Sequence, residues 1–392
     1  MEYRISDRMA GMKPSVIREI LKQMGDPTLI SFAGGNPAAD SFPKEAIARF
    51  SAELLESDPV GMLQYSVSEG VPSTREAMKR FVSRRFHVVR DTDEVLVMSG
   101  SQQIIDFAAK CLVNEGDVVA VEDPAFLGAY NTLRSHGAKL VGVPMEDDGV
   151  DLTVLEHVLK TQSPRMFYCI PNFQNPTGKT MSYEKRIAVY ELCAKYGVPI
   201  LEDDPYGELR IAGEDLPPIK SFDEKGVVIY AASFSKILSP AMRLACCVCD
   251  KGLASRMVVA KQCCDVHTTV WSQRVCERIL TETDIDAHIA SLRELYRRKA
   301  HCMLDALDTL CPSLEHTVPD GGMFIWATLP VHLDMPAFVA KCLENKVAVI
   351  PGNVFFVDEA VPCQSVRLNF SAPAPENIEK GVAVMADVLR SL

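Results

Sequence analysis

The chain has 392 residues, 47% of them hydrophobic, which is enough to bury two cores or one large core with an appended domain. Its formal net charge of −11 argues against a nucleic-acid partner and against an anionic membrane surface. The N-terminal residues lack the apolar run of a signal peptide, and no apolar run is long enough to span a bilayer. We therefore expect a soluble, cytoplasmic protein.

The thirteen cysteines predict neither disulfides nor a metal site. They are scattered singly, apart from Cys246-Cys247-x-Cys249 and Cys263-Cys264, and neither group has a second pair or a histidine at zinc-site spacing. Because the number is odd and the chain looks cytosolic, we interpret them as reduced thiols that pack as small apolar side chains.

The N-terminal part of the chain carries three features. Apolar residues at helical spacing predict a helix over 13–24, on which Arg18 lies beside Glu19. A strand at 30–33 runs into Gly34-Gly35, a pair that permits either an ordinary turn or a close approach of the backbone to a ligand. Between helices expected from residue 43 and over 73–86, Tyr65 lies in a polar loop, where its phenol either packs or donates a hydrogen bond to an anion.

From residue 94 onward, short apolar strands alternate with helical stretches. The expected strands cover 95–98, 118–121, 139–143, 166–170, 199–202, 227–230 and 244–248, and the expected helices cover 102–113, 127–134, 152–160, 183–196, 253–261 and 270–280. Continuous apolar strands that alternate with helices predict βαβ units and a mainly parallel sheet. In such sheets ligands bind beyond the carboxyl ends of the strands, and there the polar residues of this chain gather.

Three strand ends carry residues that suit a flat, anionic ligand. The strand at 95–98 leads into a turn and the start of a helix, Ser99-Gly100-Ser101-Gln102. The free amides of that helix could hold a phosphate, although a serine N-cap explains the pattern equally well. Phe126, after the next strand, either stacks on a flat ring or packs in the core. Asn175 lies in an Asn-Pro-x-Gly turn that holds its amide rigidly, so that it could hydrogen-bond a ligand oxygen.

The strand at 199–202 ends in three acids followed by a tyrosine, Glu202-Asp203-Asp204-Pro205-Tyr206. Carboxylates at a buried strand end are unfavourable unless another group pairs with them, and a protonated ring nitrogen would be such a group.

The strand at 227–230 leads through Ser233 and Ser235 to Lys236, and Arg243 follows. Burial and a nearby cation lower the pKa of a lysine from its usual ~10.4, so that the neutral amine can attack a carbonyl and form a Schiff base. Arg243 and the two serines suit phosphate oxygens. Taken alone, this pattern is more typical of a solvated lysine after a strand, and only the rest of the chain overturns that interpretation.

The long helix expected over 285–310 links to a second, smaller domain. Within it, Arg367 lies in an apolar strand, Val366-Arg367-Leu368-Asn369-Phe370, where a charge requires a partner. A substrate carboxylate and an internal ion pair both meet that requirement, and the sequence leaves both open.

Together these motifs resemble a fold-type I pyridoxal phosphate enzyme of the class I/II aminotransferase family, in the branch of 2-aminoadipate and kynurenine aminotransferases. The resemblance covers nearly the whole chain and rests on Asn175-Pro176-Thr177-Gly178, Asp203-x-x-Tyr206, Ser233-x-Ser235-Lys236 and Arg243, in that order. It implies an α/β fold: a large domain over 46–285 with a mainly parallel sheet flanked by helices, and a smaller α+β domain built from 1–45 and 286–392.

The resemblance also implies roles for individual residues. Lys236 would form a Schiff base with pyridoxal phosphate and shuttle the proton, Asp203 would pair with the pyridine nitrogen, and Asn175 and Tyr206 would bond the ring oxygen. The ring would stack on Phe126. The phosphate would be held by Gly100, Ser101, Gln102, Ser233, Ser235 and Arg243, with Tyr65 reaching across a homodimer interface. The substrate carboxylate would be bound by Arg367, with Gly35 and Asn175 nearby.

The function implied is transamination between an L-amino acid and 2-oxoglutarate or pyruvate through pyridoxamine phosphate. The side chain of the amino acid stays open, because Arg18 is either a reader of a side-chain carboxylate or a solvated helix residue. Two alternatives remain: a β-elimination lyase on the same scaffold, and a non-catalytic ligand-binding regulator, against which the presence of Lys236 and Asp203 argues. We expect amino acid and 2-oxo acid partners, and no metal, nucleic acid or membrane.

Overall fold

The computed structural model describes residues 3–12 and 26–392, so the helix predicted over 13–24, with Arg18, lies outside the described residues. The α-helices are α1 (Asp7–Ala10), α3 (Lys44–Ser57), α4 (Pro59–Leu63), α5 (Pro72–Val82), α6 (Ser101–Leu112), α7 (Leu127–Ser135), α8 (Leu152–Gln162), α9 (Tyr183–Tyr196), α10 (Lys251–Gln262), α11 (Val270–Glu282), α12 (Ile285–Leu310), α13 (Met335–Glu344) and α14 (Pro375–Ser391). The strands are β1 (Ile30–Ser31), β2 (Asp93–Met98), β3 (Val118–Asp123), β4 (Lys139–Glu146), β5 (Gly149–Val150), β6 (Phe167–Cys169), β7 (Ile200–Asp204), β8 (Val228–Ser233), β9 (Ala245–Asp250), β10 (Glu315–His316), β11 (Phe324–Thr328), β12 (Val347–Ala348), β13 (Ile350–Pro351) and β14 (Ser365–Asn369).

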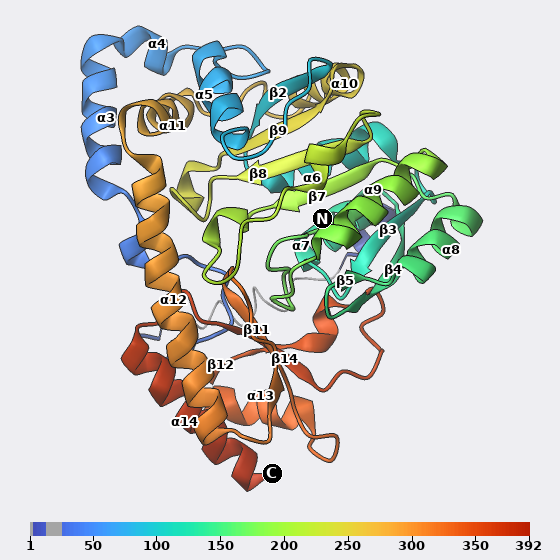
Figure 1. Ribbon diagram of the computed structural model, residues 1–392, viewed down its shortest axis with the longest axis vertical. Coiled ribbons are helices and arrows are strands. Elements are labelled where there is room, and N and C mark those ends of the chain that lie inside the picture. The colour runs from blue at the N-terminus through green and yellow to red at the C-terminus, as the bar shows by residue number, and fades with distance from the viewer. Residues whose placement is uncertain (1–2, 13–25) are drawn as a thin grey trace.

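A sheet of eight strands forms the centre of the molecule, in the order β2-β9-β8-β7-β6-β3-β4-β5 (Figure 1). The five strands from β8 to β4 pair in parallel, which confirms the predicted α/β class. β9 is the exception inside the sheet, since it runs antiparallel to both β8 and β2. The chain between β8 and β9 is short and holds no α-helix, so it can form a reversal but not the crossover that a parallel neighbour requires.

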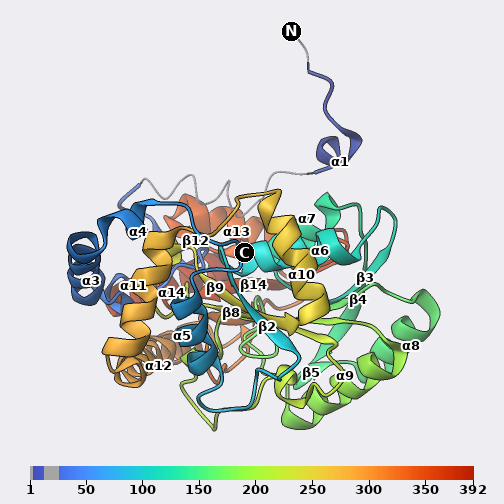
Figure 2. The same ribbon diagram turned by 90° about the horizontal axis from the view of Figure 1, so that it is seen from above.

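Helices cover both faces of this sheet, with α8 and α9 on one face and α6 on the other (Figure 2). Successive side chains of a strand point to opposite faces. On β6, Phe167 and Cys169 accordingly belong to the core under α8 and α9, whereas Tyr168 belongs to the larger core on the other face. Burial on both faces explains why these strands are apolar without alternation.

A second sheet has four antiparallel strands in the order β10-β11-β14-β13. The helix α12 begins beside the large sheet and runs down past this second sheet (Figure 1). β1 pairs in parallel with β12, so the N-terminal segment is joined to the C-terminal part of the chain. This pairing supports our division into 1–45, 46–285 and 286–392, which we keep as a proposal.

The structure corrects the helix predicted over 73–86, because α5 ends at Val82. Arg84 and Arg85 leave the helical path and form ion pairs with acids of other segments, among them Glu208. Within the described ranges, all thirteen cysteines are free thiols, no group of acidic, histidine or cysteine residues could hold a metal, and no helix is long and apolar enough to cross a membrane.

A buried ion cluster supplies a test of the large sheet. Lys220 Nζ lies 2.8 Å from Asp223 and 3.1 Å from Asp93, and all three side chains are fully buried. Lys220→Ala leaves two buried carboxylates without this cation, so we expect the free energy of unfolding to fall by about 3–5 kcal/mol in urea titrations. Lys195→Ala, which removes an exposed ion pair with Glu156, is the control and should lose far less. Equal losses of unfolding free energy in the two variants would contradict the stabilising role of Lys220 in the buried cluster.

Candidate active site

The carboxyl ends of β3, β6, β7 and β8 meet at one edge of the central sheet, and the start of β9 lies there too because that strand is reversed. A cavity of about 360 Å³ opens at this edge, within the range usual for small-molecule sites. Its lining includes most of the predicted site residues: Gly35, Ser101, Gln102, Phe126, Asn175, Asp203, Tyr206, Ser233, Ser235, Lys236, Arg243 and Arg367. Asn36, Ile170, Pro205 and Phe324 also line it and were not predicted.

Three predicted residues do not line this cavity. Arg18 lies outside the described residues. Gly100 is the N-cap residue of α6 and lies against the Arg243 side chain. The side chain of Tyr65 is largely exposed, and its ring contacts His267 edge-on at 5.8 Å between centroids.

Lys236 extends from the end of β8 into the cavity and donates a hydrogen bond from Nζ to the Gly35 carbonyl oxygen at 2.7 Å. Burial lowers the pKa of this amine to about 8, and the positive charges of Arg367 and Arg243 act in the same direction. Both effects disfavour the ammonium form. The amine is therefore partly neutral near neutral pH, as a nucleophile requires.

Asp203 lies at the end of β7 with a fully buried side chain. Its Oδ2 accepts a hydrogen bond from the Tyr168 hydroxyl at 2.9 Å, whereas Oδ1 has no hydrogen-bond partner among the described residues. Burial raises the pKa of this carboxyl to about 7. A buried acceptor without a donor is unfavourable, and a ligand N–H placed in the cavity would remove that penalty.

The start of α6 forms one end of the cavity. The N-cap position is Gly100, which has no side chain to cap the helix, so the serine N-cap that the sequence allowed is not formed. Gly100 has φ +89°, and a Cβ there would lie 2.3 Å from Arg243 Nη2. Glycine thus permits Arg243 to donate to the Ser99 carbonyl oxygen at 3.1 Å. First-turn amides beside a guanidinium suit an anion such as phosphate.

Arg367 enters the cavity from β14 of the small sheet. Its Nη1 donates to Asn175 Oδ1 at 2.9 Å and its Nη2 donates to the Ala33 carbonyl oxygen at 2.5 Å. The guanidinium lies over the ring of Phe324, 4.3 Å from its centroid. In the described ranges no carboxylate forms an ion pair with Arg367, and Nε has no hydrogen-bond partner. Burial lowers the pKa of Arg367 to about 10, so the group still carries its charge at neutral pH.

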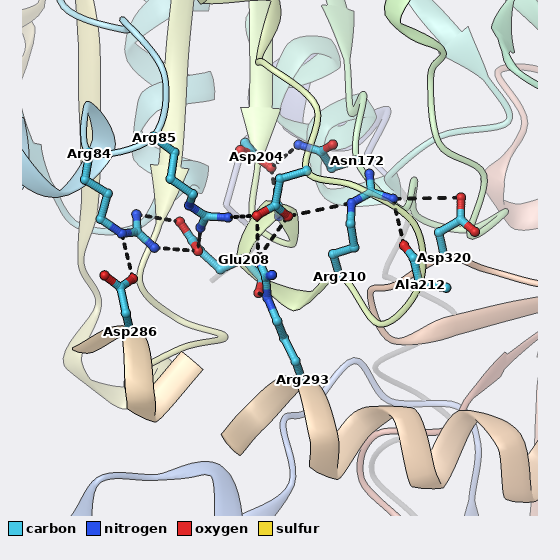
Figure 3. Close-up of polar contacts among 12 residues, drawn as sticks. Arg84, Arg85, Asn172, Asp204, Glu208, Arg210, Ala212, Asp286, Arg293 and Asp320 are labelled. Carbon is cyan, nitrogen blue, oxygen red and sulfur yellow. Dashed lines mark hydrogen bonds and ion pairs between the residues drawn. The ribbon is translucent and has the colours of Figure 1, made fainter. Parts of the chain in front are cut away.

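Tyr206 follows a turn that is fixed from several sides. Asp204 accepts hydrogen bonds from Tyr230 at 2.8 Å, from Asn172 Nδ2 at 3.0 Å and from the Gly207 amide at 2.9 Å. Its pair with Asn172 is drawn in Figure 3. The turn therefore cannot move independently of its neighbours.

An ion-pair network connects the segment after this turn to α12 (Figure 3). Glu208, in the short 3-10 helix η3 (Gly207–Leu209), pairs with Arg84 at 2.7 Å and with Arg85. Asp215 pairs with Arg85 and, at 3.0 Å, with Arg293 on α12. The network joins the end of α5, the segment after Tyr206 and the long helix that leads to the small sheet.

Sequence reasoning missed the support of the Asn175 turn. Gln174 Nε2 donates to Glu122 Oε2 at 3.2 Å and to the Pro124 carbonyl oxygen at 2.7 Å, and its own carbonyl accepts from Thr177. Glu122 also accepts from the Ile170 amide at 3.0 Å. A glutamine inside a predicted rigid turn, and an acid at a buried strand end, were the available signals.

Comparisons with known proteins agree with this geometry. A family model described as aminotransferase class I and II matches residues 27–385. The chain is 36% identical to the 2-aminoadipate transaminase of Thermus thermophilus, over 97% of this chain and 95% of the relative. It is 35% identical to aromatic-amino-acid aminotransferase 1 of Thermococcus litoralis, over 99% of this chain and 94% of the relative.

A solved structure from Thermus thermophilus is also similar. It is LysN, an α-aminoadipate aminotransferase in complex with N-(5'-phosphopyridoxyl)-L-leucine. The TM-score is 0.91 at 34% identity, and the match covers 99% of this chain and 97% of the other.

The amine of Lys236 should titrate far below an ordinary lysine. With a pKa of about 8, about one molecule in ten carries the neutral amine at pH 7, against fewer than about one in a thousand for a free lysine. In competitive acetylation of the ligand-free protein, followed by mass spectrometry, the rate at Lys236 should rise with pH and level off above about pH 8. A lysine peptide in the same mixture should keep rising toward its pKa of ~10.4. If the acetylation rates of Lys236 and of the peptide rose in parallel with pH, the buried position of the Lys236 amine would be contradicted.

Proposed function

The chain belongs to the class I and II aminotransferase family, and from this membership we propose how its own residues carry out amino transfer. The protein is an enzyme, a transaminase that exchanges an amino group between an amino acid and a 2-oxo acid. The family and the phosphopyridoxyl ligand of the Thermus relative imply pyridoxal phosphate as its cofactor. When bound, that cofactor withdraws electrons from the bonds at the α-carbon of the substrate.

The cavity residues fit this group. Asp203 Oδ1, which is buried without a donor, would accept the hydrogen bond of a protonated pyridine nitrogen. The uncapped amides of Ser101 and Gln102, with Arg243, Ser233 and Ser235, would hold the phosphate. Phe126 would stack on the ring, and Asn175 and Tyr206 would bond its oxygen.

The observation that carries the proposal is the juxtaposition of Lys236, Asp203 and Arg367 around one cavity. Each has an ionisable group in surroundings that disfavour its charge, and each lacks a counter-ion among the described residues. Lys236 Nζ, partly neutral, would bind the cofactor carbonyl and later accept the proton of the substrate α-carbon and return it. Arg367 would hold the α-carboxylate through a charge-assisted hydrogen bond.

The donor is the open part of the proposal. The relatives are named for aromatic amino acids and for 2-aminoadipate, so we propose a donor with a long or aromatic side chain. Phe324 offers apolar surface to such a side chain. We retain 2-oxoglutarate or pyruvate as the acceptor.

We propose further that the active unit is a cytoplasmic homodimer. Tyr65 does not reach the cavity of its own chain, and its side chain is 79% exposed beside exposed Val60 and Leu63. Exposed apolar side chains that lie together support an interface. In a dimer Tyr65 would reach the phosphate in the cavity of the partner.

A panel of amino donors tests the function. Aromatic, dicarboxylic and aliphatic L-amino acids are offered with 2-oxoglutarate or pyruvate, while cofactor absorbance and ammonia are followed. We expect donor-dependent absorbance changes without ammonia. Stoichiometric release of ammonia would favour the β-elimination lyase, and no change with any donor would contradict the proposal.

Replacing Lys236 should abolish turnover while leaving the cavity able to take up cofactor. We expect Lys236→Ala to lower the rate of amino transfer more than about a thousandfold, because no other amine of the described residues lines the cavity to exchange the proton. Lys139→Ala, a surface change, is the control. A rate near that of the parent enzyme would remove Lys236 from its role.

Replacing Arg367 should separate binding from chemistry. Arg367→Ala removes a charged hydrogen-bond donor to the carboxylate, so KM for the amino donor should rise roughly ten- to a hundredfold with a smaller change in kcat. Arg390→Ala, which breaks an exposed pair with Asp387, is the matched control. An unaltered KM would return Arg367 to a structural role.

A further inference from the structure

Tyr168 lies on β6, behind the wall of the cavity. Its side chain is fully buried, and it is absent from the cavity lining. Its hydroxyl donates to Asp203 Oδ2 at 2.9 Å, and this is the one hydrogen bond that the phenol makes in the described part of the chain. Among the described residues, the hydrogen bond that links Tyr168 to the site is therefore the one to Asp203.

In this hydrogen bond the Tyr168 phenol is the donor and the Asp203 carboxylate is the acceptor. Burial, together with the charge of Asp203, raises the pKa of the Tyr168 phenol well above its ordinary value, so the phenol keeps its proton. A protonated phenol has a single hydrogen to donate, and Asp203 Oδ2 receives it. The hydrogen bond therefore favours the charged carboxylate and leaves Oδ1 without a partner.

We propose that Tyr168 is a positioning residue that acts through Asp203. Its hydrogen bond to Oδ2 favours the charged carboxylate and fixes its orientation, so that Oδ1 is free to accept a hydrogen bond from the protonated pyridine nitrogen of pyridoxal phosphate. The inference rests on the proposed role of Asp203 and extends it to a residue outside the cavity.

The groups around Asp203 show why such a donor is needed. Glu122 on β3, Asp204 on β7 and the phenol of Tyr206 also face it. Burial and the charge of Asp204 raise the pKa of Asp203, whereas the Tyr168 hydrogen bond and the hydroxyl of Ser101 lower it. Without Tyr168, two of the influences would remain unfavourable to the carboxylate and only the weaker favourable one would be left.

Tyr168→Phe removes the hydroxyl and keeps the ring, so the core stays filled. The ligand-free variant is titrated with pyridoxal phosphate from pH 6 to 9 and binding is followed by absorbance. We expect roughly ten- to hundredfold weaker binding at pH 7, the effect of losing a charge-assisted hydrogen bond. Because loss of a donor raises the pKa of Asp203, the pH below which affinity falls should also move upward.

Tyr190→Phe is the matched control. Tyr190 is a buried tyrosine of the core that α8 and α9 cover, and its hydroxyl accepts a hydrogen bond from the Glu224 amide at 2.9 Å. We expect the control to bind the cofactor as the parent does. Thermal unfolding of both variants without ligand checks that the fold is kept.

A double-mutant cycle tests whether Tyr168 acts through Asp203. In the Asp203→Asn background, Tyr168→Phe should change affinity less than about twofold. Unchanged affinity and pH dependence in the single variant would overturn the inference, and so would an equal loss in the Asp203→Asn background or in the control. If the parent chain binds no cofactor, the proposed function fails and this inference falls with it.

Discussion

The burial of ionisable groups at one edge of the central sheet is the constraint on which the rest of the site depends. Removal from water disfavours the charges of Lys236, Asp203 and Arg367. For Lys236 this favours the neutral amine that its proposed role needs, whereas the charged forms of Asp203 and Arg367 would be stabilised by a bound group of opposite charge. A ligand with an electrophilic carbon, a protonated ring nitrogen and a carboxylate would satisfy all three groups. The fold therefore stores in its unliganded form an electrostatic penalty that binding relieves.

Such a penalty persists only where the surroundings are rigid, and side-chain contacts between strand ends supply that rigidity. Glu122 near the end of β3 is joined to the Asn175 turn through Gln174, and Asn172 of the same segment donates a hydrogen bond to Asp204 at the end of β7. The ends of three neighbouring strands thus behave as one unit. The ion pairs of Figure 3 continue this unit through Glu208 to α12.

The pattern of the sequence predicted the large sheet and the edge at which the cavity opens, because short apolar strands and their polar ends are local features. The roles of single residues came from the resemblance, and they stay proposals. What escaped prediction depends on contacts between distant segments. The early end of α5 follows from ion pairs to residues far along the chain, and the place of Tyr168 follows from the register of β6 against β7. Neither can be predicted from a single stretch of sequence.

The pairing of β1 with β12 has a consequence for the order in which the protein is made. Ile30 finds its partner, Val347, only after translation has passed residue 347, and Gly35 lies a few residues beyond β1. The large sheet can form earlier on the ribosome, but the side of the cavity that contains Gly35 and Arg367 closes last. Loading of the complete cavity with a small molecule therefore requires that β14, which carries Arg367, has already been made.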